Sequence, residues 1–150
     1  MAQHRLGLIM NGVTGRMGMN QHLIRSIVAI RDQGGVTLKN GDRVMPDPIL
    51  VGRNSEKLAA LAKTHGLTGF TTDLEGALKN PEDTLFFDAA TTQLRAQLLR
   101  TAMAAGKHVY CEKPVADNLA DALDLVRAAK KAGIKPVSYT HLTLPTKRIV

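Results

Sequence analysis

Short apolar runs alternate along this chain with longer segments whose apolar residues recur every three or four positions. The runs predict buried strands, and the segments predict amphipathic helices. This alternation is typical of a parallel sheet with crossover helices, so we predict an α/β fold: a doubly wound, mainly parallel sheet with helices on both faces. The predicted strands are residues 5–10, 49–51, 70–71, 85–89 and 108–111. The first predicted helix covers residues 15–31, and the second begins at a cap in Asn54 or Ser55 and buries Leu58, Leu61 and Ala62. The other predicted helices are a brief one capped by Asp73 that runs through residue 78, one over residues 94–105, and one that lies between residues 118 and 133.

Two of the predicted helices have well-defined apolar faces. The face of the first comprises Leu23, Ile24, Ile27 and Val28. The face of the last comprises Leu119, Leu123, Val126 and Ala129. Asn118 is a suitable N-cap for this last helix, and Gly133 is a suitable residue to end it.

A second local pattern interrupts the alternation between the first helix and the second strand. Residues 36–45 predict an inserted hairpin that turns at Asn40-Gly41, a dipeptide that favours the tight turns of hairpins. Two locations are open for this hairpin. It lies either beside the adenosine end of a bound cofactor or in a contact between subunits.

Three glycines separate the first strand from the first helix: Gly12, Gly15 and Gly18. In a strand–turn–helix context, the first glycine allows a tight turn, the second lets the backbone approach a pyrophosphate, and the third allows close packing of the helix. The helix N-terminus adds free N–H groups and partial positive charge. We therefore predict a Rossmann-type dinucleotide site, and its candidate residues are Gly12, Thr14, Gly15, Arg16 and Met17.

Composition excludes several other classes of protein. The net charge of +7 favours anionic ligands, but only 3% of the residues are aromatic and the basic residues are scattered, so we expect no nucleic-acid partner. No apolar run approaches the ~20 residues of a membrane span, and we expect no signal peptide before the first strand. The single cysteine, Cys111, fits a reducing compartment. We expect a cytoplasmic protein without a membrane partner or a metal site.

The residues that follow the second strand indicate which dinucleotide is bound. NAD-binding folds usually place an acidic residue there, where it holds the ribose 2′-hydroxyl. This chain has Gly52-Arg53-Asn54 instead, and a guanidinium can hold a 2′-phosphate. We therefore predict NADP in preference to NAD, with Arg53 and Asn54 as cofactor-binding residues. The alternative is that Arg53 stacks on the adenine or lies in solvent.

The fifth strand, residues 108–111, is followed directly by Glu112-Lys113-Pro114. Ligands in open α/β sheets lie beyond the carboxyl ends of the strands, so a lysine at this place can reach a bound substrate. The alternative is a solvated Glu-Lys pair in a turn.

With these motifs in view, residues 6–136 resemble the Gfo/Idh/MocA family of NAD(P)-dependent oxidoreductases. The most specific stretch, AMAAGKHVYCEKP at residues 102–114, is similar to the family signature ALxAGKHVxCEKP. The resemblance implies hydride transfer between a nicotinamide cofactor and the CH–OH group of a sugar, cyclitol or polyol. It implies that Lys113 is catalytic and also contacts the cofactor, that Glu112 lies near the nicotinamide ribose, and that Thr91 lines the cofactor cleft.

The chain departs from the family pattern in two places. Residues 92–96 replace a usual proline and histidine, and a second domain carrying an Asp and a His that complete the site is expected beyond this chain. We therefore expect residues 1–136 to be a cofactor-binding domain, inactive by itself. Residues 137–150 resemble a translated sequencing adapter and are expected to be a non-native tail. The alternative is a sixth strand at residues 138–144.

Two other functions remain open. One is a non-catalytic dinucleotide-binding module or redox sensor. The other is an enzyme like dihydrodipicolinate reductase, which shares the look of residues 15–18 but lacks the Glu-Lys-Pro segment. For the leading interpretation we expect a small-molecule substrate and a full-length form that is a homo-oligomer.

Overall fold

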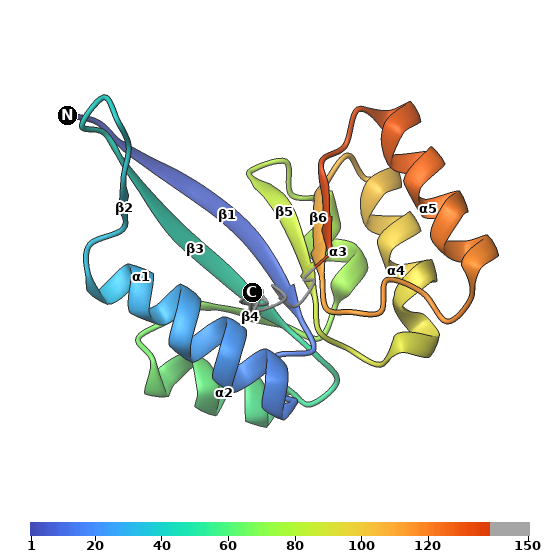
Figure 1. The fold of residues 1–150 in the computed structure, drawn as a ribbon. Helices are drawn as coiled ribbons and strands as arrows, with labels where there is room; N and C mark the ends of the chain where they lie inside the picture. Colours follow the sequence, from blue (N-terminus) through green and yellow to red (C-terminus); the bar gives the residue numbers. More distant parts are fainter. Residues whose placement is uncertain (139–150) are drawn as a thin grey trace, which may run out of the picture.

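The computed structural model describes residues 1–138, which fold into a seven-stranded sheet with helices on both faces (Figure 1). The strands are β1 (Gln3–Asn11), β2 (Val36–Thr37), β3 (Arg43–Val51), β4 (Gly69–Thr71), β5 (Asp83–Asp88), β6 (His108–Cys111) and β7 (Pro136–Ser138). The helices are η1 (Gly18–Val28), α1 (Ala29–Asp32), α2 (Ser55–Thr64), α3 (Leu74–Lys79), α4 (Thr92–Ala104) and α5 (Leu119–Ala132).

The strand order reverses at β1. The order is β2-β3-β1-β5-β6-β7, and β4 also pairs with β3. From β1 the chain builds β3 and β4 on one side of the sheet, then crosses over to build β5, β6 and β7 on the other side. All these pairings are parallel; only β2 runs antiparallel to its neighbour. The prediction of a Rossmann-type, doubly wound sheet is confirmed, and the reversal places a switch point between β1 and β5.

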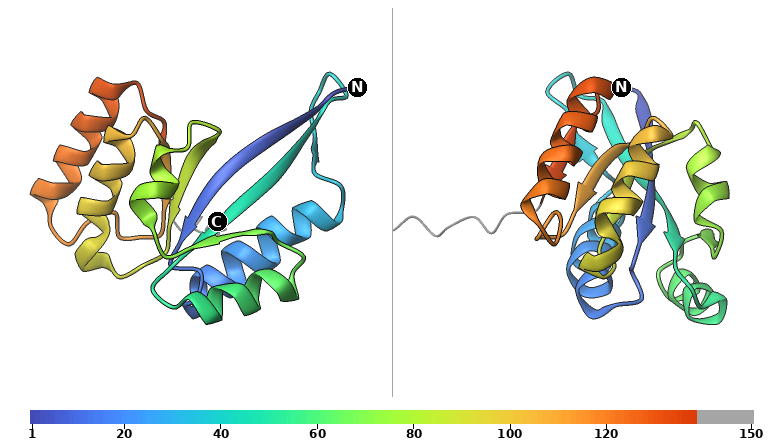
Figure 2. Two further views of the ribbon diagram at one scale, coloured as in Figure 1. Left: turned by 180° about the vertical axis from the view of Figure 1, so that it is seen from behind. Right: turned by 90° about the vertical axis from the view of Figure 1, so that its right-hand side faces the viewer.

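Each face of the sheet buries its own apolar cluster, because successive residues of a strand point to opposite faces. Ile9 and Phe86 pack with residues of α3, α4 and α5. Met10 and Phe87 pack with residues of η1 and α2 on the other face. Figure 2 shows these two groups of helices on opposite sides of the strands.

The helix after the glycine turn is wider than predicted. Residues Gly18–Val28 form a π-helix, in which hydrogen bonds span five residues, as in the bond from Ala29 N–H to Ile24 O. Its inward face therefore differs from that of an α-helix. Leu23 and Val28 are buried as predicted, but Ile24 and Ile27 are only half-buried, and His22 is buried in their place.

The second strand is longer than predicted, because β3 begins at Arg43 and includes Pro46 and Pro48. On the side of β3 away from β1, β2 covers residues 43–44 and β4 covers residues 49–51. Residues 45–48 therefore have an open edge, where a proline without an N–H group is tolerated.

The predicted hairpin exists, since β2 pairs antiparallel with the first residues of β3. Those residues lie beside Gln3 and His4 at the amino end of β1, whereas the glycine turn follows the carboxyl end (Figure 1). The prediction that the hairpin lies beside the adenosine end of a bound cofactor is therefore wrong. A subunit contact at the hairpin stays a prediction.

The apolar face predicted for α5 is largely wrong. Leu119, Leu123 and Val126 are 73%, 46% and 60% exposed; of the predicted face only Ala129 is buried, and the helix packs through it and through Leu125, which was not predicted. At the end of the described chain, Val137 and Ser138 lie in β7, which pairs with β6. Residues 139–150 lie outside the described residues, so the assignment of a non-native tail stays a prediction.

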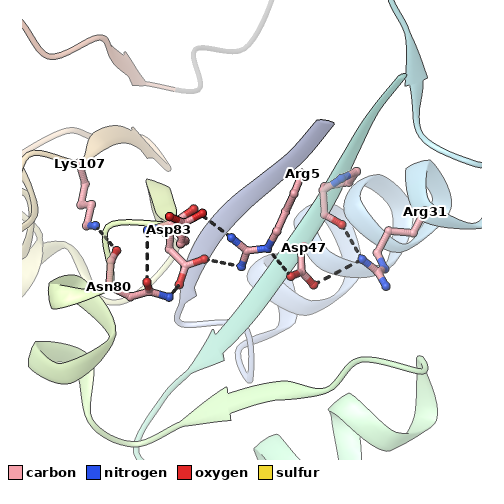
Figure 3. A network of polar contacts seen from close by, with 8 residues as sticks. Arg5, Arg31, Asp47, Asn80, Asp83 and Lys107 are labelled. Carbon is pink, nitrogen blue, oxygen red and sulfur yellow. Dashed lines mark hydrogen bonds and ion pairs between the residues drawn. The ribbon is translucent and has the colours of Figure 1, made fainter. Parts of the chain in front are cut away.

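A polar network joins three strands near their amino ends (Figure 3). Arg5 on β1 donates from Nε to Asp47 on β3 and from one terminal nitrogen to Asp83 at the start of β5, both at 2.7 Å. These hydrogen bonds raise the pKa of Arg5, with Asp47 the largest cause. Asp83 is fully buried and also accepts from Asn80 at 2.8 Å. Within residues 1–138, no helix is both long and apolar enough to cross a membrane.

Candidate cofactor cleft

A cleft of about 550 Å³ opens at the carboxyl ends of β1, β3 and β5. It lies at the switch point, where doubly wound sheets bind their ligands. Five of the predicted site residues line it: Gly12, Thr14, Gly15, Arg53 and Thr91. The cleft is also lined by Asn11, Val51, Gly52, Thr72, Leu74, Ala89, Ala90, Leu94 and Leu98.

The glycine turn has the geometry that its sequence predicts. Gly12 adopts a φ of +81°, and a Cβ there would lie 2.5 Å from the backbone nitrogen of Ala90. A Cβ on Gly18 would lie 2.5 Å from Gly12 O, so this glycine lets the helix start close to the turn. Gly15 differs from both, because the nearest atom to its Cβ position is Gly12 O at 3.4 Å. The open side of Gly15 is therefore available to a ligand.

The two helices that begin at the cleft lack side-chain caps. Neither η1 nor α4 has a capping hydrogen bond or an acidic residue in its first turn. By contrast α2, α3 and α5 are capped by the side chains of Asn54, Asp73 and Asn118. The positive ends of the helix dipoles of η1 and α4, which no side chain caps, suit an anion such as a pyrophosphate.

Of the predicted residues near β1 and β3, Arg16, Met17 and Asn54 do not line the cleft, whereas Arg53 does. Arg16 and Met17 are exposed at the start of the first helix. Asn54 accepts a hydrogen bond from Lys57 N–H at 2.8 Å, so its side-chain oxygen caps α2. Arg53 is exposed, and no hydrogen bond or ion pair to its side chain occurs among the described residues.

The two residues that follow β6, Glu112 and Lys113, differ in their exposure to solvent. Lys113 is exposed, whereas Glu112 is buried and pairs through Oε1 with Nε2 of His22 on η1. The His22 ring packs against Phe87, with ring centroids 4.6 Å apart, and against Tyr110. Neither Glu112 nor Lys113 lines the cleft described above. The sequence singled out Glu112 but missed its partner, which is 90 residues away along the chain.

Asp88 at the end of β5 and Arg95 in α4 form a second buried pair. Asp88, the last residue of β5, accepts from Arg95 Nε at 2.9 Å and from Asn11 Nδ2 at 2.8 Å. Asp88 is fully buried, and Arg95 is 2% exposed. Sequence analysis did not identify this pair. The one signal available was the departure from the family pattern at residues 92–96, where Arg95 lies.

A parallel sheet with a glycine turn and an open cleft at its switch point defines a dinucleotide-binding Rossmann domain. A family model for oxidoreductases with an NAD-binding Rossmann fold, the Gfo/Idh/MocA family, matches residues 14–141, and the chain belongs to this family.

Individual relatives agree with this assignment. The chain is 49% identical over 137 residues to a D-xylose dehydrogenase of Paenarthrobacter nicotinovorans, covering 91% of the chain and 35% of the relative. It is 32% identical over 116 residues to a 1,5-anhydro-D-fructose reductase of Ensifer adhaerens, covering 77% of the chain and 32% of the relative. The chain therefore spans about a third of the length of these curated relatives.

Solved structures resemble the chain over most of its length. A levoglucosan dehydrogenase, solved with NADH and levoglucosan, matches with a TM-score of 0.71 and 25% identity, covering 91% of the chain and 34% of the dehydrogenase. An oxidoreductase domain protein from Kribbella flavida matches with a TM-score of 0.74 and 27% identity, covering 90% of the chain and 35% of that protein.

Proposed function

We propose that this chain is the cofactor-binding part of an NAD(P)-dependent dehydrogenase that acts on a sugar or polyol. The observation that carries the proposal is the cleft at the switch point, with Gly15 open to it and two uncapped helices beginning at it. The similarity to a D-xylose dehydrogenase, a 1,5-anhydro-D-fructose reductase and a levoglucosan dehydrogenase supports a carbohydrate substrate.

Residues that follow different strands of the sheet would bind different parts of the cofactor and the substrate. The positive N-terminal end of η1, next to the open side of Gly15, would hold the pyrophosphate. Arg53, which lines the cleft at the end of β3, would hold a 2′-phosphate and favour NADP over NAD. Bound nicotinamide supplies the site that accepts or donates the hydride. Lys113, exposed beyond β6, would polarise the substrate oxygen and stabilise the negative charge that develops on it.

We further propose that the 150-residue chain binds the cofactor without turning over a substrate by itself. Hydride transfer to or from a hydroxyl needs a proton acceptor held against the substrate. None of the described histidines lines the cleft, and His22 is paired with Glu112, which does not line the cleft either. The remaining part of the site would belong to a longer protein of the size of the relatives.

Calorimetric titration of the chain with NADPH, NADH and ATP tests the cofactor proposal. We expect both dinucleotides to bind, NADPH more tightly, and ATP to bind weakly because it lacks the second nucleotide. Equal weak binding of all three nucleotides would contradict the proposal. An absorbance assay with NADP, NAD and D-xylose or sorbitol tests the second part, and measurable turnover by the isolated chain would contradict it.

A further inference from the structure

The three guanidinium nitrogens of Arg95 reach three acceptors on two segments, one at the end of β5 and one after β6. Nε donates to Asp88 Oδ2 at 2.9 Å, one terminal nitrogen donates to Ala90 O at 2.7 Å, and the other donates to Pro114 O at 2.6 Å. Asp88 ends β5, Ala90 lies in the loop from β5 to α4, and Pro114 follows Lys113 in the loop after β6. One side chain of α4 therefore ties both loops to the end of the sheet.

This arrangement is buried and charge-balanced. The side chains of Arg95 and Asp88 are 3% and 0% exposed. Asp88 is itself held on its other oxygen by Asn11 Nδ2 at 2.8 Å and by Ala90 N–H at 3.3 Å. Asn11 and the Ala90 N–H hold the Asp88 carboxylate, and Asp88 in turn holds the Arg95 guanidinium in place. Because the guanidinium is planar and rigid, its two terminal nitrogens then fix the carbonyl groups of Ala90 and Pro114 in the two loops.

The two loops lie on one half of the proposed cofactor site. A doubly wound sheet binds one nucleotide on each side of its switch point. The glycine turn after β1 and Arg53 after β3 lie on the adenosine half. The loops that follow β5 and β6 are therefore left for the nicotinamide half, and these are the loops that Arg95 holds.

We infer that Arg95 is a positioning residue for the nicotinamide half of the site; the inference rests on the proposed cofactor function. Arg95 does not face the cofactor, since its nitrogens all point to Asp88 and to the two backbone carbonyls. It acts by holding the Ala90 carbonyl and the segment of Lys113 and Pro114 at a fixed separation. A lysine cannot replace it, because a single ammonium group lacks the planar fork that reaches all three acceptors.

The experiment compares each dinucleotide with its adenosine-side fragment in the 150-residue chain. The two ligand pairs are NADPH with 2′-phospho-ADP-ribose and NADH with ADP-ribose, titrated by calorimetry. In Arg95→Met we expect the affinity for the dinucleotide to fall roughly tenfold, the equivalent of one hydrogen bond to a charged group, while the affinity for the fragment changes less than about twofold. Arg95→Lys is expected to shift the ratio in the same direction, because it keeps the charge beside Asp88 but loses the fork.

Arg100→Met is the matched control. Arg100 lies on the same helix and also forms ion pairs with carboxylates, Asp121 and Asp124 on α5, at partly exposed positions and without touching either loop. We expect its dinucleotide-to-fragment ratio to match the wild type. A residue that only stabilised the fold would lower the unfolding temperature and leave that ratio unchanged.

The outcomes separate the two proposals. Wild-type chain that binds none of the four ligands would overturn the cofactor function and this inference with it. Wild-type binding with an unchanged ratio in both Arg95 variants, or with equal losses for dinucleotide and fragment, would overturn the inference alone. If Arg95→Met does not fold, the ratio in Arg95→Lys decides by the same criterion.

Discussion

His22 and Glu112 form a buried pair that joins the helix after the glycine turn to the segment after β6. The pair connects the two motifs by which the sequence suggested a function. Its geometry depends on the wide turn of η1, which turns His22 inward where an α-helical face would have placed Ile24 or Ile27. Glu112 Oε2 also accepts from Lys113 N–H at 3.3 Å, so the pair orders the backbone at the lysine.

We expect His22→Phe to destabilise the chain by about 1–3 kcal/mol, the range for leaving a buried acceptor without its partner. Phenylalanine keeps a ring against Phe87 and Tyr110 but removes the nitrogen that pairs with Glu112. Urea unfolding of His22→Phe, Glu112→Gln and the double variant measures the effect. The two changes should be non-additive by at least about 0.5 kcal/mol, as for residues in direct contact. Additive losses would mean that the two side chains do not stabilise each other.

We expect Arg5→Met to destabilise the chain by about 1 kcal/mol or somewhat more, toward the lower end of the range for an unsatisfied buried acceptor. The loss arises at Asp83, which is fully buried and keeps only its Asn80 contact on the other oxygen. The lower end applies because the Arg5 side chain is itself 41% exposed and its charge is screened by water. Arg100→Met, which breaks ion pairs between partly exposed side chains, should cost less in the same urea unfolding assay. An equal or larger loss in Arg100→Met would contradict this account of the network in Figure 3.

The sheet and the glycine turn could be predicted from sequence because both depend on local patterns. Alternating apolar runs set the strands, and a positive φ at Gly12 is required wherever a strand turns this tightly into a helix. The full length of β3 could not be predicted in this way. Its prolines are tolerated only because residues 45–48 border no strand on one side, and that is a property of the assembled sheet.

The buried polar pairs could not be predicted either. Locally, Asp88 is the end of a strand and Arg95 is one residue of a helix, and one of the acceptors of Arg95, the Pro114 carbonyl, lies 19 residues further along the chain. The exposed leucines of α5 are the opposite case, in which the sequence predicts burial and the fold leaves the side chains exposed. Leu119 and Leu123 have helical spacing, but the periodicity does not show which face has a neighbour to pack against.

We expect Gly15→Val to keep the fold and lose the dinucleotide. Apart from Gly15 and its two chain neighbours, no residue has an atom closer than 3.4 Å to a Cβ at this position, so the new side chain would project into the space of the pyrophosphate. NADPH affinity should fall about tenfold or more, a change of at least about 1.4 kcal/mol, while the unfolding temperature stays near that of the wild type. A Gly15→Val variant that binds NADPH normally would show that the glycine only shapes the turn.

Gly12→Ala should unfold the chain, in contrast to Gly15→Val. It combines a φ of +81° with a Cβ only 2.5 Å from Ala90 N. Gly106→Ala is the matched control, because its φ is +76° but no atom lies within 4 Å of its Cβ position. We expect the control to lose only about 1–2 kcal/mol from backbone strain. Equal stabilities of the two variants in thermal unfolding would mean that the contact with the loop after β5 is easily relieved.

We expect Arg53→Ala to weaken NADPH binding by about 1–3 kcal/mol and to leave NADH binding nearly unchanged, because only NADPH carries the 2′-phosphate that a guanidinium would hold. Arg127→Ala is a useful control, since Arg127 is exposed on α5 and does not line the cleft. Calorimetry with both cofactors checks the expectation. Equal losses for NADPH and NADH would indicate that Arg53 stacks on the adenine, and no loss for either would place it in solvent.

The catalytic role proposed for Lys113 requires a full-length protein that carries residues 102–114 unchanged. In such a protein Lys113→Met should lower kcat by about 10²–10³, as for the loss of one electrostatic stabiliser, and should change the cofactor affinity far less. Methionine keeps the length and the apolar stem of the side chain but removes the charge that would interact with the developing oxyanion. Lys130→Met, which changes an exposed lysine on α5, should leave kcat unchanged. Steady-state kinetics with NADP and D-xylose measure both variants. A near-normal kcat in Lys113→Met would make the lysine an ordinary solvated residue of the turn.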